Sequence, residues 1–349
     1  MEADPTTEMR AGPRLRWGIL GCARIARRGL IPAIAGSRTG TLLALASRDE
    51  AVSRAWCREF MIPKAYGSYQ AVLDDPEIDA VYIPLPNELH KPWVLAAADA
   101  GKQVLCEKPL ALDAGEARDV VEYCRKRGVI LMEAFMWRHQ PRTLDIRRLV
   151  VQGTIGELRL IRSSFSFPIG PGDWRLDLRR GGGCLWDVGC YGVNTARLFA
   201  GGEPAIGRAL ARFGGTGVDL GFTAILEFRE GVLATIDCSF EQPFRCEYEL
   251  VGSRGVIEVP DAYLPPADSR PAARLRTLGT GSDSGAGGDQ VQVLEFEPVN
   301  QYAAMVDSFA HSCAGGTLLD PAEDGLAQML VLEQLVSAAR ERGRAPGPT

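Results

Sequence analysis

Short apolar segments alternate with helix-forming segments throughout the first 135 residues, and this alternation limits the fold more than any other feature of the sequence. Parallel neighbouring strands need a crossover connection of a dozen or more residues, which is usually a helix. Strands that alternate with helices at this spacing therefore predict an α/β fold with a parallel, doubly wound sheet. The predicted strands cover residues 16–20, 41–46, 78–83, 103–106 and 129–135.

A glycine turn follows the first predicted strand and opens a helix. A strand, a glycine turn and a helix form the layout that binds a dinucleotide, with the pyrophosphate at the N-terminus of the helix. In the Gly-x-Gly-x-x-Gly pattern, Gly21 fits the first position, whereas Ala23 and Ala26 replace the other two glycines. The match is weak by itself. It makes candidate cofactor-binding residues of Gly21, Cys22, Ala23, Arg24 and Ile25.

The end of the second predicted strand bears on the choice of cofactor. Ser47-Arg48-Asp49 follows the glycine turn by roughly 25 residues. An acidic residue in this region binds the ribose 2′-hydroxyl of NAD, whereas an arginine accommodates the 2′-phosphate of NADP. Ser47 can donate a hydrogen bond and Arg48 can form a charged pair with phosphate. The sequence favours NADP, and Asp49 leaves NAD open; a solvated loop arginine is the alternative for Arg48.

The strand at residues 103–106 runs into Glu107-Lys108-Pro109. Proline cannot donate a hydrogen bond to a sheet, so the strand ends here. Ligands of open α/β sheets bind beyond the carboxyl ends of the strands. Lys108 is therefore a candidate catalytic residue, although an arbitrary lysine before a loop is more often a surface residue.

The preceding strand, at residues 78–83, also ends in a polar segment. If the two strands are neighbours, this segment and Glu107-Lys108 meet at one crevice. His90 alone would more commonly cap a helix or lie in a solvated loop, but the convergence favours contact with a cofactor. The candidate cofactor-binding residues of these two strand ends are Pro84, Leu85, Asn87, His90, Glu107 and Lys108.

Three consecutive glycines, 181–183, precede a second informative segment. They permit a close approach of a ligand or of another backbone. Asp187, Tyr191 and Asn194 are spaced i, i+4 and i+7, which places them on one face of a helix. The neighbouring residues are mostly apolar, so this helix should be buried, and an unpaired buried polar group costs roughly 1–3 kcal/mol. Either the three side chains form hydrogen bonds within the protein as a structural network, or they face a polar ligand. The spacing alone does not decide between the two.

The second half of the chain reads as strands with hairpin-like glycine turns, which suggest an antiparallel sheet. We expect disordered ends at residues 1–13 and 343–349, a cofactor-binding domain at 14–137 and a second domain at 138–342. Asp261 to Gln290 is rich in Pro, Gly, Ser and Asp and predicts a long, exposed and mobile loop. Helices are expected at residues 143–151, 300–313 and 321–342. The predicted strands cover residues 157–167, 208–213, 222–228, 233–240, 246–251 and 256–259.

Charge and composition exclude several classes of function. The formal charge of −5 argues against a nucleic-acid surface and gives no reason to expect a membrane partner. No apolar run approaches the ~20 residues of a membrane span, and residues 1–13 lack the apolar region of a secretory signal. The nine cysteines include no Cys-x-x-Cys pair and there are three histidines, so we expect no metal site. Dispersed thiols without a signal predict reduced cysteines and a cytoplasmic protein.

Taken together, the motifs resemble the glucose–fructose oxidoreductase / inositol dehydrogenase (Gfo/Idh/MocA) family over nearly the whole chain, from about Arg16 to Arg340. The matching segments are Gly21-x-Ala-Arg-Ile-Ala26, Tyr82-Ile-Pro-Leu-Pro-Asn87-x-x-His90, Ala100-Gly-Lys-x-Val-Leu-Cys-Glu-Lys-Pro109, Glu133-Ala-Phe-Met-Trp-Arg138 and Gly181-Gly-Gly-x-Leu-x-Asp-x-Gly-x-Tyr191. The resemblance implies a Rossmann domain followed by a domain with a large open sheet. It also implies a homodimer or homotetramer formed through that sheet.

The resemblance further implies roles for individual residues. Lys108 is the catalytic lysine, and its bond to Pro109 is expected to be cis. Tyr191 replaces the histidine of the inositol dehydrogenase branch and is expected to be the acid/base, with Lys108 lowering the pKa of its phenol and Asp187 holding Lys108 or a substrate hydroxyl. The expected substrate contacts are Lys108, Asp187, Tyr191 and Asn194. Arg138, Trp174 and Arg175 are further expected cofactor contacts.

The tyrosine resembles the branch with NADP-dependent D-xylose dehydrogenases, dimeric dihydrodiol dehydrogenase and sugar 3-ketoreductases. We predict an NADP-dependent oxidoreductase acting on a sugar hydroxyl or carbonyl, first of all an aldose dehydrogenase of the D-xylose type. The alternatives are a 3-ketoreductase of a nucleotide-linked deoxysugar and a trans-dihydrodiol dehydrogenase. A non-enzymatic regulator on the same fold would bind the cofactor without turning over a sugar.

Overall fold

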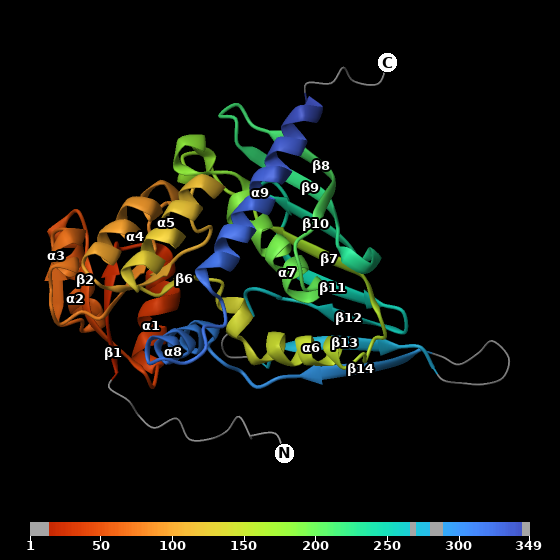
Figure 1. Ribbon diagram of the computed structural model, residues 1–349, viewed down its shortest axis with the longest axis horizontal. Coiled ribbons are helices and arrows are strands. Elements are labelled where there is room, and N and C mark those ends of the chain that lie inside the picture. The colour runs from red at the N-terminus through yellow and green to blue at the C-terminus, as the bar shows by residue number, and fades with distance from the viewer. Residues whose placement is uncertain (1–13, 266–269, 280–288, 344–349) are drawn as a thin grey trace.

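The computed structural model of the chain describes residues 14–265, 270–279 and 289–343 and contains two sheets that lie side by side (Figure 1). The predicted disordered segments are 1–13 and 343–349, and all of their residues except Gly343, which ends a helix, lie outside the described residues. So do residues 266–269 and 280–288 of the predicted loop.

The first sheet has six strands in the order β3-β2-β1-β4-β5-β6, and every pair in it is parallel. The predicted α/β fold with a doubly wound parallel sheet is confirmed. The edge strand β3 was not predicted from the sequence, because its three half-buried residues form no apolar run. The strands are β1 (Leu15–Leu20), β2 (Gly40–Ala46), β3 (Lys64–Tyr66), β4 (Ala80–Ile83), β5 (Gln103–Cys106) and β6 (Leu131–Glu133).

Helices begin where short polar side chains precede them. Asp49, Ser68 and Asp113 each accept a hydrogen bond from a backbone N–H in the first turn of the following helix. Such caps satisfy donors that have no partner within the helix. The helices of this part are the π-helical turn η1 (Ala26–Leu30), α1 (Ile31–Gly36), α2 (Glu50–Phe60), α3 (Tyr69–Leu73), α4 (His90–Asp99) and α5 (Ala114–Arg127).

The second sheet has eight strands in the order β14-β13-β12-β11-β7-β10-β9-β8 and is antiparallel except for the β7–β10 pair. The predicted large, mainly antiparallel sheet is thereby confirmed. Its strands are β7 (Leu158–Ser166), β8 (Ala205–Phe213), β9 (Asp219–Glu227), β10 (Leu233–Ser239), β11 (Arg245–Gly252), β12 (Gly255–Val259), β13 (Ala272–Thr277) and β14 (Gln290–Glu295).

The prediction of one exposed loop from Asp261 to Gln290 is wrong for β13, which lies inside it. This strand pairs with both β12 and β14, and its residues Ala273 and Leu275 are buried. The alternation that buries them spans six residues, and the surrounding Pro, Gly and Ser residues concealed it in the sequence.

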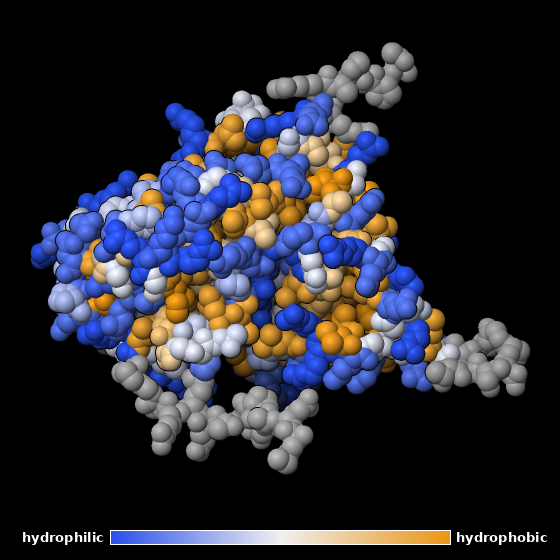
Figure 2. All heavy atoms as spheres, viewed as in Figure 1, coloured by the Kyte–Doolittle hydropathy of each residue, from blue (hydrophilic) through white to orange (hydrophobic). Residues whose placement is uncertain are grey.

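One face of the second sheet is covered by helices. We call the first sheet with its helices the first unit and the second sheet with its helices the second unit. α7 (Cys190–Ala200) packs on β7 and β10, and α9 (Ala322–Gly343) packs on β8 and also on α5 of the first unit. α6 (Pro141–Val151) lies on the same side (Figure 1). In this view hydrophilic residues dominate the surface over α2 to α5, whereas hydrophobic residues gather around the second sheet and its helices (Figure 2).

Helix α8 (Gln301–Cys313) returns to the first sheet although it comes from the far end of the chain (Figure 1). Its Phe309 packs on Trp17 of β1, with ring centroids 5.3 Å apart. Asp307 Oδ1 accepts a hydrogen bond of 2.6 Å from Ser37 Oγ. The division into domains at 14–137 and 138–342 stays a prediction, and by packing α8 lies with the first unit.

Candidate active site

A cavity of about 550 Å³ lies between the carboxyl ends of β1, β2, β4 and β5 and the wall formed by β7 and α7. This is within the size range of small-molecule sites. Sixteen of the predicted site residues line it: Gly21, Cys22, Ala23, Arg24, Ile25, Ser47, Arg48, Pro84, Leu85, Asn87, Glu107, Lys108, Trp174, Arg175, Asp187 and Tyr191.

The glycine-turn end of the cavity fits a dinucleotide. Gly21 has φ +117°, and a Cβ at this position would lie 2.8 Å from Leu85 Cδ2. The turn therefore requires glycine here and leaves the backbone open towards the cavity. The first N–H groups of a helix have no intrahelical partner and favour an anion.

The Ser47-Arg48 end fits an additional phosphate better than a free ribose. Ser47 and Arg48 both line the cavity, and their side chains carry a hydroxyl and a guanidinium. The carboxylate of Asp49, which NAD would need for its ribose, instead accepts a 2.9 Å hydrogen bond from the backbone N–H of Ala51 and caps α2. Tyr69, which sequence analysis missed, lines the same end; burial raises the pKa of its phenol, and the neighbouring Arg48 opposes the rise.

Lys108 and Asp187 form the electrostatic centre of the cavity. Lys108 Nζ donates to Asp187 Oδ1 at 3.0 Å and to the Asp187 carbonyl oxygen at 2.6 Å. Arg175 Nε donates to the other carboxylate oxygen, Oδ2, at 2.7 Å. Burial alone would raise the pKa of Asp187, but the two cations reverse this and lower it. Asp187 is thus a fixed carboxylate, and the Lys108–Pro109 bond is cis, as the resemblance implied.

Tyr191 is placed beside Lys108 in an unexpected way. Lys108 Nζ lies over the ring, 5.1 Å from its centroid, whereas the hydroxyl faces the sulfur of Met136 at 3.6 Å. Burial is the largest cause that raises the pKa of the phenol well above its usual range, and Tyr302 and Glu107 add to the rise. The prediction that Lys108 lowers this pKa is wrong for this arrangement, because the cation meets the ring face and is neutralised by Asp187.

The helix that bears these residues is not regular. Residues Leu185–Gly189 form a π-helical turn, η6, before α7 begins at Cys190. Asp187 and Tyr191 reach the cavity, but Asn194 does not line it. Asn194 is 1% exposed, and neither polar atom of its side chain has a hydrogen-bond partner among the described residues. The structure does not support the predicted substrate contact of Asn194.

His90 is also placed away from the cavity. Its ring is fully buried, with Nε2 2.8 Å from the Leu85 carbonyl oxygen and Nδ1 2.9 Å from the Pro109 carbonyl oxygen. The imidazole ties the loop after β4 to the turn after Lys108. The predicted contact of His90 with the cofactor is corrected to a structural role one layer behind the cavity.

Arg138 belongs to a buried ionic cluster rather than to the cavity. Its Nε pairs with Asp320 Oδ1 at 2.8 Å and its Nη1 with Asp324 Oδ2 at 2.5 Å. Glu133 lies in the same cluster and is 4% exposed. Burial, followed by the charge of Asp324, raises the pKa of Glu133 to about 8. The predicted contact of Arg138 with the cofactor is therefore not supported.

The three glycines before Asp187 lie close against other parts of the protein: a Cβ would meet side chains at Gly181 and Gly183 and backbone at Gly182. A Cβ at Gly182 would lie 2.2 Å from the carbonyl oxygen of Arg175. The segment of Trp174 and Arg175 thus lies directly against the start of η6. It is also tied to the first unit, because Asn87 Nδ2 donates to the Gly181 carbonyl oxygen at 2.9 Å and Arg180 pairs with Glu88 at 2.8 Å.

Several aromatic and apolar side chains of the cavity wall were missed by sequence analysis. Tyr302 comes from the first turn of α8, and its ring would be 2.9 Å from a Cβ at Gly29. Nothing in the local sequence indicates that a residue so far along the chain returns to this site. The other missed members of this wall are Val52, Pro86, Met136, Phe165, Phe167, Val188 and Leu264.

In residues 14–265, 270–279 and 289–343, no three His, Cys, Asp or Glu side chains are grouped so that they could hold a metal ion. Within the same part of the chain no helix combines the length and apolarity needed to cross a membrane.

Comparisons with known proteins agree with this geometry. A family model described as "Oxidoreductase family, NAD-binding Rossmann fold" matches residues 15–135, and the "GFO/IDH/MocA C-terminal domain" matches residues 143–258. D-xylose 1-dehydrogenase (NADP(+)) 2 of Haloferax volcanii is 39% identical over 95% of this chain and 99% of its own length. The dTDP-3,4-didehydro-2,6-dideoxy-alpha-D-glucose 3-reductase of Streptomyces antibioticus is 34% identical over 95% and 98% of the two chains.

A solved structure extends the likeness to three dimensions. The crystal structure of a 3-ketoreductase from Actinomadura kijaniata, in complex with NADP and TDP-benzene, matches with a TM-score of 0.85 at 32% identity. The match covers 93% of this chain and 98% of that chain. The fold and the cavity thus define an oxidoreductase with a nicotinamide dinucleotide-binding unit. The chain belongs to the GFO/IDH/MocA family of oxidoreductases.

The buried Glu133 generates a pH prediction. Its pKa is about 8 in the folded protein and about 4.3 in an unfolded chain. Between these values the folded state retains a proton that the unfolded state has lost, so the free energy of unfolding falls as pH rises through this window. We expect Glu133→Gln to remove this slope and to stabilise the protein at pH 8 by up to about 5 kcal/mol.

Urea unfolding of both proteins at pH 5.5, 7 and 8.5 measures the effect. The exposed Glu122→Gln on α5 is the control and should keep the wild-type slope. An unchanged slope in Glu133→Gln would contradict the assignment.

Proposed function

We propose that this protein is an NADP-dependent dehydrogenase of an aldose of the D-xylose type. The observation that supports the proposal is the cluster of Lys108, Asp187 and Tyr191 at one end of a cavity whose other end has Ser47 and Arg48 for a phosphate. The relative that is 39% identical is an NADP-dependent D-xylose 1-dehydrogenase, which agrees with this assignment.

The nicotinamide supplies hydride transfer when the cofactor is bound, so the protein has to orient the substrate and move one proton. Lys108 Nζ gives two of its hydrogen bonds to Asp187, which leaves a third N–H for the reacting oxygen of the sugar. Because Asp187 is held ionised by two cations, it orients Lys108 and does not exchange protons.

Tyr191 is the proton-transfer group in this proposal. Its raised pKa keeps the phenol protonated, so in the reducing direction it donates a proton to the carbonyl oxygen of the substrate. In the oxidising direction the phenol first releases its proton to solvent, and the resulting phenolate then accepts the proton of the substrate hydroxyl as hydride leaves the same carbon. Lys108 stabilises the negative charge that develops on the substrate oxygen in both directions.

A 3-ketoreductase of a nucleotide-linked deoxysugar is the second candidate. The wall of Phe165, Phe167 and Leu264 offers no hydrogen-bonding side chain to a sugar. Each hydroxyl of a substrate that is buried without a partner weakens binding. A deoxysugar, or the ring of a trans-dihydrodiol, presents fewer hydroxyls to this wall than a free aldose does. Turnover of NADPH with a keto-deoxysugar nucleotide, and none with xylose, would establish this alternative, and NADP binding without any turnover would indicate a regulator.

The catalytic roles predict a clear split between turnover and binding. Tyr191→Phe and Lys108→Met should each lower kcat by about 10²–10⁴-fold. The dissociation constant of NADPH, read from its fluorescence, should change little. The test is a panel of aldoses with absorbance at 340 nm, and wild-type turnover in either variant would exclude this mechanism.

The phosphate end predicts a cofactor preference. Arg48→Met should weaken NADPH binding by about 10- to 100-fold, because a charge-assisted bond to the 2′-phosphate is lost. Binding of NADH should stay nearly constant. Arg54→Met, which removes an exposed arginine of α2 paired with Glu50, is the control. An equal loss of both cofactors in Arg48→Met would remove the 2′-phosphate role.

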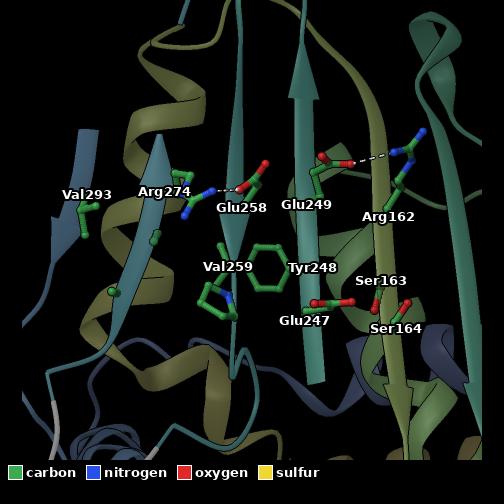
Figure 3. A pocket seen from close by; sticks show the side chains of 13 residues that line it. Arg162, Ser163, Ser164, Glu247, Tyr248, Glu249, Glu258, Val259, Arg274 and Val293 are labelled. Atoms are coloured by element: carbon green, nitrogen blue, oxygen red, sulfur yellow. Dashed lines mark hydrogen bonds and ion pairs between the residues drawn. The ribbon is translucent and has the colours of Figure 1, made fainter. Parts of the chain in front are cut away.

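We also propose that two copies associate through the uncovered face of the second sheet. On this face Arg274, Glu258, Glu249 and Arg162 lie in a row across β13, β12, β11 and β7 (Figure 3). Arg162 and Glu249 are paired at 3.1 Å, and Arg274 and Glu258 at 3.7 Å. A shallow hollow lies on this face, and its lining shares no residue with the cavity that contains Lys108.

The apolar side chains of the same face provide the test. Ile225 on β9 is 42% exposed, and Leu144 on the helix-covered side is 41% exposed. We expect the wild type to have a dimeric or tetrameric mass by light scattering. Ile225→Asp should shift the protein towards the monomer, and Leu144→Asp should not. A monomeric wild type would contradict the proposal.

A cytoplasmic location completes the proposal. All nine cysteines lie in the described part of the chain, and all nine are free thiols. Free thiols are typical of a reducing compartment.

A further inference from the structure

The segment before the three glycines contains the same short pattern twice. Asp173-Trp174-Arg175 and Asp177-Leu178-Arg179 each begin a one-turn 3₁₀ helix, η4 (Trp174–Leu176) and η5 (Leu178–Arg180). Each aspartate accepts a 3.0 Å hydrogen bond from the backbone N–H two residues later. Each also pairs with its own arginine, at 3.2 Å for Asp173 and Arg175 and at 3.3 Å for Asp177 and Arg179.

The two arginines differ in their exposure and in their further contacts. The side chain of Arg179 is 90% exposed, whereas that of Arg175 is 23% exposed and donates to Asp187 Oδ2 at 2.7 Å. A pair on an exposed side chain contributes little to stability or to charge placement. The Asp173–Arg175 pair is different because it continues into the catalytic cluster.

Four alternating charges therefore form one row: Asp173, Arg175, Asp187 and Lys108. The successive distances are 3.2, 2.7 and 3.0 Å, and the four side chains are only 12–23% exposed. The row has no net charge. In a site with little water, removal of one charged side chain leaves the charge of its neighbour uncompensated. The change in electrostatic potential then extends along the row to Lys108.

We propose that Asp173 is a positioning residue for the catalytic lysine. It holds the guanidinium of Arg175 against Asp187 Oδ2, so that Asp187 Oδ1 stays available to Lys108. It also neutralises Arg175, which would otherwise place an uncompensated positive charge near Lys108. The consequence for turnover rests on the proposed function; the consequence for Lys108 itself does not.

Other charged and titratable groups near this row are accounted for. Lys108 is faced by Asp187, Glu107 and Cys190, and burial, the largest effect, lowers its pKa while these groups reverse the direction to a net rise. Arg24, on the glycine turn, lies 3.7 Å from Asp173 Oδ2, with a side chain that is 79% exposed. Arg24 is too exposed to replace Arg175 as the partner that matters to Asp173.

Because Asp173 and Arg175 carry opposite charges, their removal should shift the protonation of Lys108 in opposite directions. Asp173→Asn keeps a residue that caps a helix well and removes only the negative charge. The uncompensated Arg175 then disfavours the ammonium form of Lys108. Arg175→Met removes the positive charge and should favour the ammonium form. Asp177→Asn, which makes the same change in the neighbouring copy of the pattern, is the matched control.

The measurement is the rate at which Lys108 is acetylated by acetic anhydride in the full-length protein without cofactor, followed by peptide mass spectrometry between pH 7 and 10. The free amine reacts, so at pH 8 Asp173→Asn should label Lys108 about 3- to 10-fold faster than the wild type. Arg175→Met should label more slowly and Asp177→Asn at the wild-type rate. An unchanged rate in Asp173→Asn, or an equal change in Asp177→Asn, overturns the proposal.

The pH profile of kcat provides a second readout. In Asp173→Asn the alkaline limb should move to lower pH, and in Asp177→Asn it should stay in place. If no sugar is turned over by any protein, the proposed function fails while the labelling still decides the role of Asp173. If a sugar is turned over but Asp173→Asn changes neither the acetylation rate of Lys108 nor the alkaline limb of the kcat profile, the function stands and the positioning role is wrong.

Discussion

The carboxylate of Asp187 is the contact on which the candidate site depends. It belongs to the second unit of the molecule and binds Lys108, which follows β5 of the first unit, and Arg175, which lies on the segment between β7 and η6. Separating a buried carboxylate from its two cations costs much free energy, because each charge left alone would be poorly solvated. The contact joins the two units beside the cavity where the cofactor and substrate are expected to meet. Tyr191, one turn further on, takes its position from the same π-helical turn.

Much of this arrangement follows from local sequence. The alternation of strands and helices predicted the first sheet, and the ends of its strands placed Gly21, Ser47 and Lys108 at one cavity. These predictions succeed because strand direction and the position of strand ends are local properties. The roles of His90, Arg138 and Asn194 were not predictable in this way. Each lies close in sequence to a cavity residue, but the rotation of its element directs its side chain to a buried layer behind the cavity.

Other features depend on contacts that span the chain. The strand β13 could not be recognised from six residues among Pro, Gly and Ser, and its partner strands define it. Tyr302 reaches the cavity because α8 packs back on the first sheet. The pKa of Tyr191 depends on whether Lys108 meets its hydroxyl or its ring, and spacing alone does not distinguish these. The apolar wall of Phe165 and Phe167 likewise decides how many substrate hydroxyls can be satisfied, and this bears more on the substrate than any motif does.

The return of α8 to the first sheet has a consequence for how the protein is made. Met305, Val306 and Phe309 are fully buried against a unit whose other elements were synthesised far earlier. A ribosome must therefore pass Cys313 before Trp17 acquires its packing partner. Until then the surface of the nascent first unit that α8 will cover stays exposed. All strands of the second sheet have been synthesised before α8, the last helix that packs on the first sheet. The strands of the first unit are thus synthesised first, but this unit acquires its last helix only after the second sheet has been synthesised. Completion of the dinucleotide-binding unit is therefore a late event in the biogenesis of this chain.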